Sequence, residues 1–347
     1  MNSNFKLENL IRTNVKTLSP YSSARDEFSG TSSVFLDANE NPFDNGVNRY
    51  PDPQQWKLKE RLSEIKKVPA KQMILGNGSD EIIDLIMRAF CEPKQDRVII
   101  CNPTYGMYQV AAQINDLKIC ERDLDSNFQP DVNGILNNNN SKLLFLCSPN
   151  NPTGNLIDKD ILIKLLSEFN GIIVLDEAYI DFSSDASMVK DLDKYPNLVI
   201  LQTLSKAWGM AGIRLGIGLS SVEIIEILNK IKQPYNVNTL TQNKALELLS
   251  YEETYQERIN TLLEERNAMM NELRSHSFVE KVFPSQANFI LIRVKDANAL
   301  YQFLIEKGIV IRNRTTISRL KNCLRISIGT PIENQELYKF LREFQDQ

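Results

Sequence analysis

The segment TLSKAWGMAGIRLG, residues 203–216, brings two cations, Lys206 and Arg214, close together and separates them mainly by small residues. A lysine in a largely apolar setting near another cation has its ammonium form disfavoured, which frees the amine to attack a carbonyl carbon. Formation of a Schiff base is the natural use of such an amine. Lys206 is therefore the candidate nucleophile of this chain.

Further polar residues follow short apolar runs. LLFLC (143–147) leads into SPNNPTG, GIIVLD (171–176) leads into EAY, and LVILQT (198–203) leads into LSK. In an open α/β sheet, ligands bind beyond the carboxyl ends of the strands. We therefore expect one edge of the sheet to carry an amide, an acid, a phenol, a hydroxyl and an amine, contributed by Asn151, Asp176, Tyr179, Ser205 and Lys206.

These residue types fit a pyridine-type electron sink, which needs an acid at its ring nitrogen, a donor at its phenolic oxygen and an anion site for a phosphate. Asp176 could supply the acid, and Asn151 with Tyr179 the donors. Arg214, Ser205 and the helix start GNGSD could hold the phosphate, because the glycines let a ligand approach free N–H groups at Gly78, Ser79 and Asp80.

Taken singly, each of these features has an ordinary structural explanation. Lys206 could be a solvated side chain, Asp176 a residue at a strand end, NPTG a type I turn and GNGSD a capped helix start. Asp80 and Glu81 also place negative charge in the first turn of that helix. Only the combination indicates a site.

The order NPTG, DEAY, LSK and GIRLG resembles the fold type I pyridoxal-phosphate-dependent aminotransferases over almost the whole chain. Within that superfamily, further motifs resemble the histidinol-phosphate aminotransferase family of class II. They are LSPYSSARDE (18–27), LDANENP (36–42), RYPDP (49–53), GNGSDEII (76–83), PTYGMY (103–108), CSPNNPTG (147–154), DEAYIDF (176–182) and CLRISIGT (323–330).

The resemblance implies pyridoxal 5'-phosphate as cofactor and a role for each residue. Lys206 would form the Schiff base and move a proton between substrate and cofactor carbons. Asp176 would meet the ring nitrogen. The other implied cofactor contacts are Asn151 and Tyr179 at the ring oxygen, Tyr105 on the ring face, and Ser205, Arg214, Gly78, Ser79 and Asp80 at the phosphate, joined by Tyr50 from the partner subunit of a homodimer. The implied substrate contacts are Tyr21, Asn39, Arg312 and Arg325.

The reaction that the resemblance implies is a ping-pong amino transfer between glutamate and imidazole-acetol phosphate, giving 2-oxoglutarate and L-histidinol phosphate, in histidine biosynthesis. Two alternatives share the fold, because a fold does not fix the outcome at the substrate carbon: an aromatic or broad-range aminotransferase, and a phosphothreonine-type decarboxylase. A non-catalytic, cofactor-binding module is an alternative of another class. Its mark would be loss of the lysine or the acid, and both are present.

Two departures from the family pattern bear on the site. The bulky Trp208 stands where small residues are usual, and we expect it to pack in the core. Arg314 lies two residues after Arg312, so either arginine could be the one that points inward. In CLRISIG, the alternation of Leu324, Ile326 and Ile328 turns Arg325 away from their apolar face.

The elements that must position these residues alternate between strand and helix. Apolar runs that include RVIIC (97–101) and GIGL (216–219) are each followed by turn residues and an amphipathic stretch, which predicts parallel strands covered by helices. SDEIIDLIMRAF (79–90) has a clear helical period, and we expect Ser79 to be its N-cap. The predicted fold is an α/β fold type I transferase with a mostly parallel, doubly wound sheet.

The pattern of charged and apolar residues changes after about residue 240. A long charged helix (251–275) precedes ANFILIRV, GIVIR and CLRISIG, and NQELYKFLREF closes the chain. We expect an N-terminal arm over residues 1–30, a large cofactor-binding domain over 31–240, and a small α+β domain over 241–347, with residues 31–50 partly at the small-domain and dimer interface.

Composition excludes several classes of function. The 347 residues carry a net charge of −4, which offers no basic field to nucleic acid or an anionic membrane. No apolar run is long enough to span a bilayer and the N-terminus lacks a signal-like core, so we expect a cytoplasmic protein. Five cysteines show no CxxC spacing, and one histidine, His276, excludes multi-histidine metal sites within a chain; we expect no metal, and His276 in a solvated loop.

Overall fold

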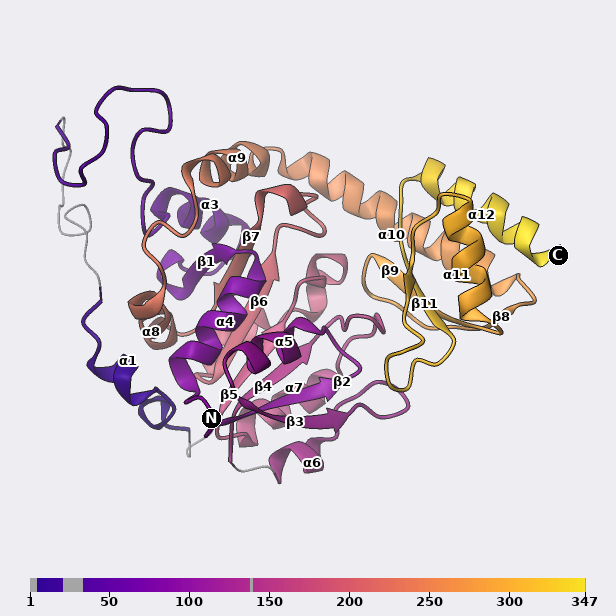
Figure 1. The fold of residues 1–347 in the computed structure, drawn as a ribbon, viewed down its shortest axis with the longest axis horizontal. Helices are drawn as coiled ribbons and strands as arrows, with labels where there is room; N and C mark the ends of the chain where they lie inside the picture. The colour runs from indigo at the N-terminus through magenta and orange to yellow at the C-terminus, as the bar shows by residue number, and fades with distance from the viewer. Residues whose placement is uncertain (1–4, 21–33, 138–139, 347) are drawn as a thin grey trace.

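The computed structural model describes residues 5–20, 34–137 and 140–346. Figure 1 shows a larger lobe, in which helices surround a sheet, and a smaller lobe formed by the C-terminal part of the chain. The long helix α10 (Glu252–Arg274) runs from one lobe to the other. It matches the charged helix predicted over residues 251–275.

The large sheet has seven strands in the order β1-β7-β6-β5-β4-β2-β3. Its strands are β1 (Met73–Asn77), β2 (Arg97–Asn102), β3 (Lys118–Asp123), β4 (Ser141–Cys147), β5 (Ile172–Asp176), β6 (Leu198–Thr203) and β7 (Leu215–Leu219). The prediction of a doubly wound, mostly parallel sheet is confirmed. The prediction that GIGL continues the parallel set is wrong, since β7 runs antiparallel to both β6 and β1. The short connection after β6 returns the chain as a hairpin instead of through a crossover helix.

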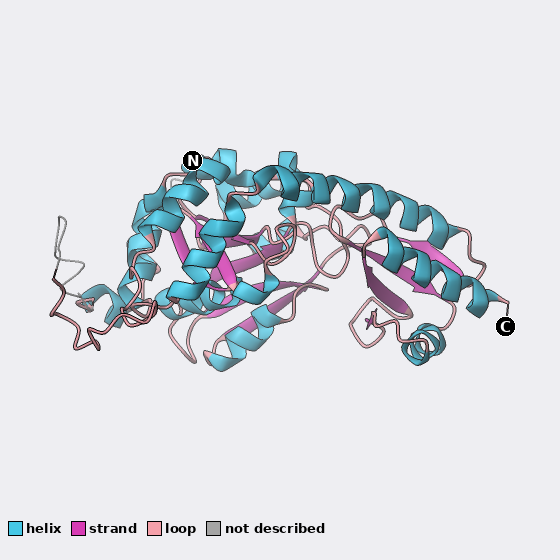
Figure 2. Ribbon diagram, turned by 90° about the horizontal axis from the view of Figure 1, so that it is seen from above, coloured by secondary structure: helices cyan, strands magenta, loops and turns pink. Residues whose placement is uncertain are grey.

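Helices cover both faces of this sheet (Figure 2). They are α3 (Trp56–Lys66), α4 (Ser79–Phe90), α5 (Met107–Ile114), α6 (Val132–Leu136), α7 (Lys159–Glu168), α8 (Val222–Ile231) and α9 (Thr239–Leu249). Successive side chains of β5 point to opposite faces of the sheet and so pack in two separate cores. Ile173 and Leu175 belong to one hydrophobic cluster, and Ile172 and Val174 belong to the other. A strand buried on both faces therefore ends in Asp176 at the edge of the sheet.

Helix α4 begins one residue earlier than the capping pattern predicts. Gly78 is its N-cap and Ser79 its first helical residue, and no side chain caps the N-terminus. Gly78 has a φ of 74°, which glycine adopts without the penalty that a side chain incurs. Since no cap occupies them, the first N–H groups of α4 remain available to a ligand.

The small lobe is a four-stranded antiparallel sheet in the order β10-β11-β9-β8, packed against helices on one face. It comprises β8 (Val279–Val282), β9 (Phe289–Val294), α11 (Ala297–Glu306), β10 (Arg312–Asn313), β11 (Cys323–Ser327) and α12 (Pro331–Gln345). Of the predicted strand GIVIR (308–312), only Arg312 lies in a strand, the two-residue β10. Leu324 and Ile326 face the small-lobe core, as the alternation indicated, whereas Cys323 joins the core of the large lobe. Arg325 shares the direction of Cys323 and so faces the large lobe.

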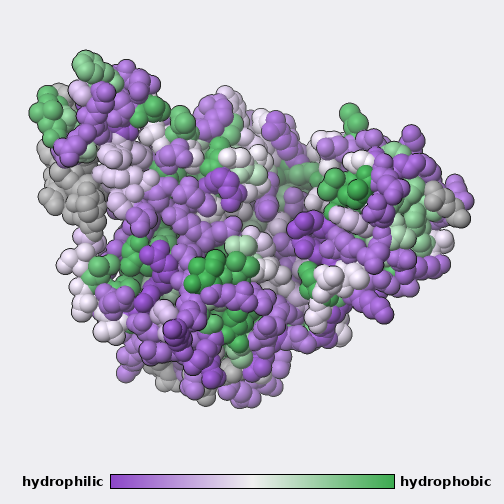
Figure 3. Space-filling model, in the orientation of Figure 1, coloured by the Kyte–Doolittle hydropathy of each residue, from purple (hydrophilic) through white to green (hydrophobic). Residues whose placement is uncertain are grey.

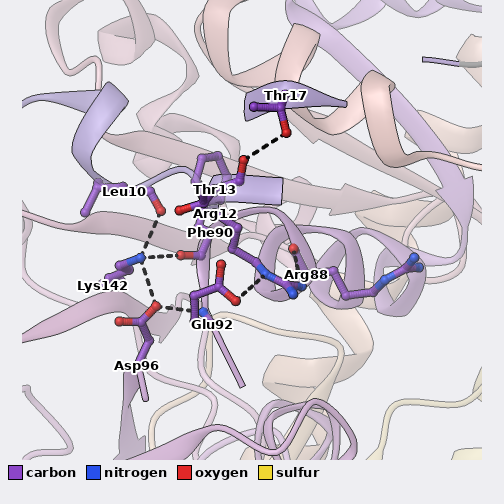
Figure 4. Close-up of polar contacts among 9 residues, drawn as sticks. All are labelled: Leu10, Arg12, Thr13, Thr17, Arg88, Phe90, Glu92, Asp96 and Lys142. Carbon is purple, nitrogen blue, oxygen red and sulfur yellow. Dashed lines mark hydrogen bonds and ion pairs between the residues drawn. The ribbon is translucent and has the colours of Figure 1, made fainter. Parts of the chain in front are cut away.

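The N-terminal segment is tied to the large lobe around Lys142 (Figure 4). The ammonium of Lys142 donates to the carbonyl oxygens of Leu10 and Phe90, and forms a 2.8 Å ion pair with Asp96. Arg12 pairs with Glu92 at 3.3 Å beside it. This anchor fixes the short helix α1 (Thr13–Thr17), directly before the undescribed residues 21–33.

Two sequence-based expectations for single side chains have different outcomes. Trp208 packs in the core as predicted, with its ring 5.4 Å from that of Tyr255. The expectation of a solvated loop for His276 is wrong, because only 4% of this residue is exposed and its ring stacks on Phe278. Within the described part of the chain, no helix is long and apolar enough to cross a membrane.

Candidate active site

A cavity of about 500 Å³ opens where the carboxyl ends of the large-lobe strands meet the small-lobe sheet. Strand ends, the first turn of α4 and the start of α5 line it from the large lobe, and Arg312 of β10, Arg314 just after β10 and Arg325 of β11 line it from the small lobe. Twelve of the fifteen residues that the sequence predicted for the site line it: Gly78, Ser79, Asp80, Tyr105, Asn151, Asp176, Tyr179, Ser205, Lys206, Arg214, Arg312 and Arg325.

Asp176 lies at the buried end of the cavity. Its Oδ1 accepts a hydrogen bond from the Ala178 amide at 2.9 Å, and its Oδ2 accepts one from the Tyr108 hydroxyl at 2.6 Å. Burial raises the pKa of Asp176 to about 6, because water is no longer available to solvate the carboxylate, and the two hydrogen bonds oppose that rise. The carboxyl group can therefore still ionise near neutral pH.

Asn151 and Tyr179 meet at the side of the cavity. The Asn151 amide nitrogen lies 3.2 Å from the Tyr179 hydroxyl, and its Oδ1 accepts a 2.5 Å hydrogen bond from Arg325. These contacts fix the amide orientation and leave the Tyr179 hydroxyl proton and the second N–H of Asn151 available as donors. Burial raises the pKa of the Tyr179 phenol above its usual range, so the group stays a neutral donor.

Lys206 follows β6 and stands in the open part of the cavity, with Nζ 5.5 Å from the centre of the Tyr179 ring. The surrounding walls lower the pKa of its ammonium by desolvation, and the positive charge of Arg325 lowers it further. A larger share of the side chain is therefore the neutral amine, the form that attacks a carbonyl carbon.

One end of the cavity is built to receive an anion. The Gly78 amide donates to the Arg214 carbonyl at 2.8 Å, which holds the start of α4 against the loop before β7. A Cβ at Gly78 would lie 2.7 Å from Nη2 of Arg214, so only glycine leaves this space open. Asp80 partly neutralises the guanidinium from 3.9 Å. The Tyr105 hydroxyl also bonds Asp80, at 3.1 Å.

Three arginines converge at the other end. Arg312, Arg314 and Arg325 all line the cavity, and Arg312 pairs in register with Arg325 across the two strands. None of them forms an ion pair with a described residue. Arg314, in the NRTTIS loop, is less exposed than Arg312 at the start of β10, and desolvation, together with the other two cations, lowers its pKa to about 10. Both arginines therefore border the cavity, with Arg314 deeper.

The remaining predicted residues do not reach this cavity. Tyr21 lies outside the described residues. Asn39 and Tyr50 line a different cavity of about 450 Å³ beside the start of α9, where Tyr50 stacks on Tyr235 with 4.5 Å between ring centres. Within one chain, these two side chains are not part of the lysine site.

Sequence reasoning missed Tyr108 and the inward position of Arg314. Tyr108 is fully buried in α5, and an aromatic residue on the apolar face of a helix is typical of the core. Its position three residues after Tyr105 places it on the same side of the helix start, which is the signal that could have indicated it. No comparable signal separates Arg314 from Arg312.

Comparison with known proteins supplies the family. The sequence model of the family described as aminotransferase class I and II matches residues 29–341. The chain belongs to this aminotransferase family. A histidinol-phosphate aminotransferase of Parabacteroides distasonis is 54% identical over 338 residues, which cover 97% of this chain and 98% of that protein.

Solved structures agree with this aminotransferase fold. The histidinol-phosphate aminotransferase of Clostridium acetobutylicum superposes with a TM-score of 0.80 and 27% identity, covering 86% of this chain and 91% of the other. The histidinol-phosphate aminotransferase of Sinorhizobium meliloti, solved in complex with pyridoxal 5'-phosphate, gives a TM-score of 0.78 at 23% identity, covering 85% and 83% of the two chains.

Proposed function

We propose that this aminotransferase is a pyridoxal-phosphate-dependent histidinol-phosphate transaminase. It would convert L-histidinol phosphate and 2-oxoglutarate reversibly into imidazole-acetol phosphate and L-glutamate. The observation that carries the proposal is a cavity lined by Lys206, by Arg214 beside the start of α4, and by the three small-lobe arginines Arg312, Arg314 and Arg325. One end would hold the phosphate of the cofactor and the other the anion of the substrate. The 54% identity with a histidinol-phosphate aminotransferase supports the choice of substrate.

The residues present fit pyridoxal phosphate as cofactor. A buried carboxylate, Asp176, suits a protonated ring nitrogen; the donors of Asn151 and Tyr179 suit a phenolic oxygen; and the open space at Gly78 beside Arg214 suits a phosphate. Ser79, Asp80 and Ser205 would add backbone and hydroxyl donors there, with Tyr105 beside the ring. When bound, the cofactor supplies a carbonyl carbon for amino transfer and an electron sink.

The chain's own groups would handle binding and proton transfer. Nζ of Lys206 would accept a proton from the amino-bearing carbon of the substrate and return it later in the transfer, because its lowered pKa favours the neutral amine. The guanidinium groups of Arg325, Arg314 and Arg312 would bind the phosphate of histidinol phosphate and the carboxylate of glutamate in turn. Both substrates would therefore use one site alternately.

We further propose a homodimer in which Tyr50 and Asn39 complete the partner's cavity. Apolar side chains stand exposed before α3 and on α9, among them Val34, Leu36, Phe43, Val47 and Leu240. Figure 3 has apolar residues at its upper left, over the extended segment that precedes α3 in Figure 1. Burial of such a surface between two copies would stabilise the dimer. A cytoplasmic location, and the absence of nucleic-acid and membrane partners, remain expectations from composition.

Two assays test the proposed function. Purified protein loaded with pyridoxal phosphate should transfer the amino group of histidinol phosphate to 2-oxoglutarate with a higher kcat/KM than that of phenylalanine, and should release no carbon dioxide from phosphothreonine. A preference for phenylalanine, or decarboxylation, would favour one of the same-fold alternatives.

Borohydride reduction, followed by peptide mass spectrometry, identifies the lysine that carries the cofactor. The mass of the cofactor should appear on the peptide that contains Lys206 and be lost in Lys206→Ala, whereas Lys321→Ala, which changes an exposed lysine in the small lobe, should label as the unaltered protein does. Labelling of another lysine would contradict the assignment.

A further inference from the structure

Tyr108 is a buried side chain whose hydroxyl meets the carboxyl group of Asp176 and the thiol of Cys147. Its hydroxyl donates to Oδ2 of Asp176 at 2.6 Å, and none of the side chain is exposed. A length of 2.5–2.7 Å is typical of a hydroxyl that donates to an ionised carboxylate, whereas bonds between neutral groups are longer. The contact is therefore of the strong, charge-assisted kind.

The surroundings of Asp176 make this bond important. The titratable groups near the carboxyl group are Asp80 on α4, Cys147 at the end of β4, Lys206 after β6, and the tyrosines Tyr105, Tyr108 and Tyr179. Lys206 is the one cation that acts on Asp176 among the contributors, and Asp80 opposes it. With burial favouring the protonated form, the Tyr108 hydroxyl and the Ala178 amide are the direct donors that favour the carboxylate.

Tyr108 also braces the ring that is expected to cover the cofactor. Its ring stacks on Phe145 of β4 with centres 5.1 Å apart, and Tyr105 meets it edge-on at 5.5 Å. Packing on the sheet thus sets the position of the Tyr108 ring. The Tyr108 hydroxyl contacts Asp176, and the ring itself contacts Tyr105. Aromatic pairs in these arrangements stabilise one another beyond the area they bury.

We propose that Tyr108 is a positioning residue that keeps Asp176 ionised and directed into the cavity, so that Asp176 can receive the protonated nitrogen of a heteroaromatic ring. The proposal rests on the proposed function, since it takes that ring to be the cofactor's. Tyr108 itself touches neither substrate nor cofactor in this assignment. Without the hydroxyl, the carboxyl group would lose a donor and hold its proton to higher pH.

The test is the binding of pyridoxamine 5'-phosphate to the cofactor-free full chain between pH 5.5 and 9. This probe has no aldehyde, so it cannot react with Lys206. The ratio of the dissociation constants of Tyr108→Phe and the unaltered protein cancels every titration of the probe. We expect the ratio to be about tenfold at pH 6, the scale of one lost hydrogen bond to a charged group, and to approach one at pH 9, where Asp176 is ionised in both proteins.

A merely structural role gives a different result: a ratio that stays the same at every pH, which would overturn the proposal. Tyr338→Phe is the matched control, because Tyr338 is a buried tyrosine of the small lobe whose hydroxyl has no hydrogen-bond partner among the described residues; its ratio should stay near one. Failure of the cofactor assignment on which the proposal rests is distinguishable, because the unaltered protein would then not bind the probe at all. Misfolding of Tyr108→Phe would show as loss of probe binding at pH 9 as well, which also contradicts the proposal.

Discussion

At the scale of single residues, the site is dominated by charges that are partly removed from water. Asp176 has its pKa raised to about 6 by burial, Lys206 has its pKa lowered, and Arg314 has its pKa lowered to about 10. Each shift favours the less charged form, so each group is held in the cavity at a cost in stability of the free protein. A ligand that carries the opposite charge would recover this cost.

The cofactor-free protein should therefore be stabilised by removing the charge of Asp176. An aspartate ionises near pH 3.9 in the unfolded chain and near 6 in the folded one, so the folded state binds more protons between these values and stability falls as the pH rises through them. Asp176→Asn should remove up to roughly 3 kcal/mol of this pH-dependent loss in the free energy of unfolding. Urea unfolding of both cofactor-free proteins at pH 5 and 7.5 measures it. A variant without any relative gain at pH 7.5 would contradict the expectation.

The arginines should differ in which half-reaction they serve. Arg325→Ala should lower kcat/KM about 30-fold to several thousand-fold with both glutamate and histidinol phosphate, because it leaves each anion unpaired. Arg314→Gln and Arg312→Gln should mainly impair the half-reaction with histidinol phosphate, whose phosphate carries more charge, and Arg314→Gln more severely because Arg314 lies deeper. Stopped-flow measurement of each half-reaction decides this. If Arg312→Gln harms both halves equally, or Arg325→Ala harms neither, the assignment of the anion site is wrong.

At the scale of elements, strand ends and one helix start hold the site together. Gly78, at the start of α4 beside the loop before β7, keeps the anion site open. Its positive φ and the nearness of Arg214 both favour glycine at this position. The consequence is testable with one methyl group.

Gly78→Ala should weaken binding of pyridoxal phosphate and lower the free energy of unfolding by about 1–3 kcal/mol, since the new Cβ meets Arg214 and the backbone is strained. Gly212→Ala is the control, in the loop before β7, where an added Cβ has no heavy atom within 4 Å. Equilibrium dialysis and denaturant unfolding report the two effects. Equal behaviour of the two variants would show that the space at Gly78 does not matter.

Patterns local to one strand were readable from the sequence, and relations between distant segments were not. Alternation placed Arg325 opposite Leu324 and Ile326, and strand ends placed Asp176 and Lys206 at one edge. The direction of β7 depends on a hairpin return that apolar runs do not encode. Tyr108 looked like any core aromatic because its partner lies 68 residues away. The burial of His276 likewise depends on a distant contact, with Gln345 near the end of α12.

At the scale of the whole molecule, one chain brings together a lysine, an acid and two anion sites but leaves Tyr50 and Asn39 beside another cavity. A dimer that shares residues accounts for this division. The domain boundaries at residues 30 and 240 remain predictions.

Mixing inactive subunits tests the shared site. Lys206→Ala subunits mixed with Tyr50→Phe subunits should recover activity, because one site of the mixed dimer then holds both native residues. Lys206→Ala mixed with Asp176→Ala is the control and should recover none, since both residues line the cavity of the same chain. The measurement is activity after refolding the mixtures, with mixed dimers verified by mass. No recovery in the first mixture would rule out sharing of Tyr50.

The cluster of arginines at the small-lobe end of the cavity also sets a limit on throughput. If glutamate and imidazole-acetol phosphate occupy this cluster alternately, each can also enter the form of the enzyme that awaits the other compound. A high concentration of either should then slow turnover by dead-end occupancy, and the slowing should be relieved by raising the other. Inorganic phosphate, which meets the same guanidinium groups, should act in the same way, so the rate in a cell would depend on the balance of these anions and not on the amount of one substrate alone.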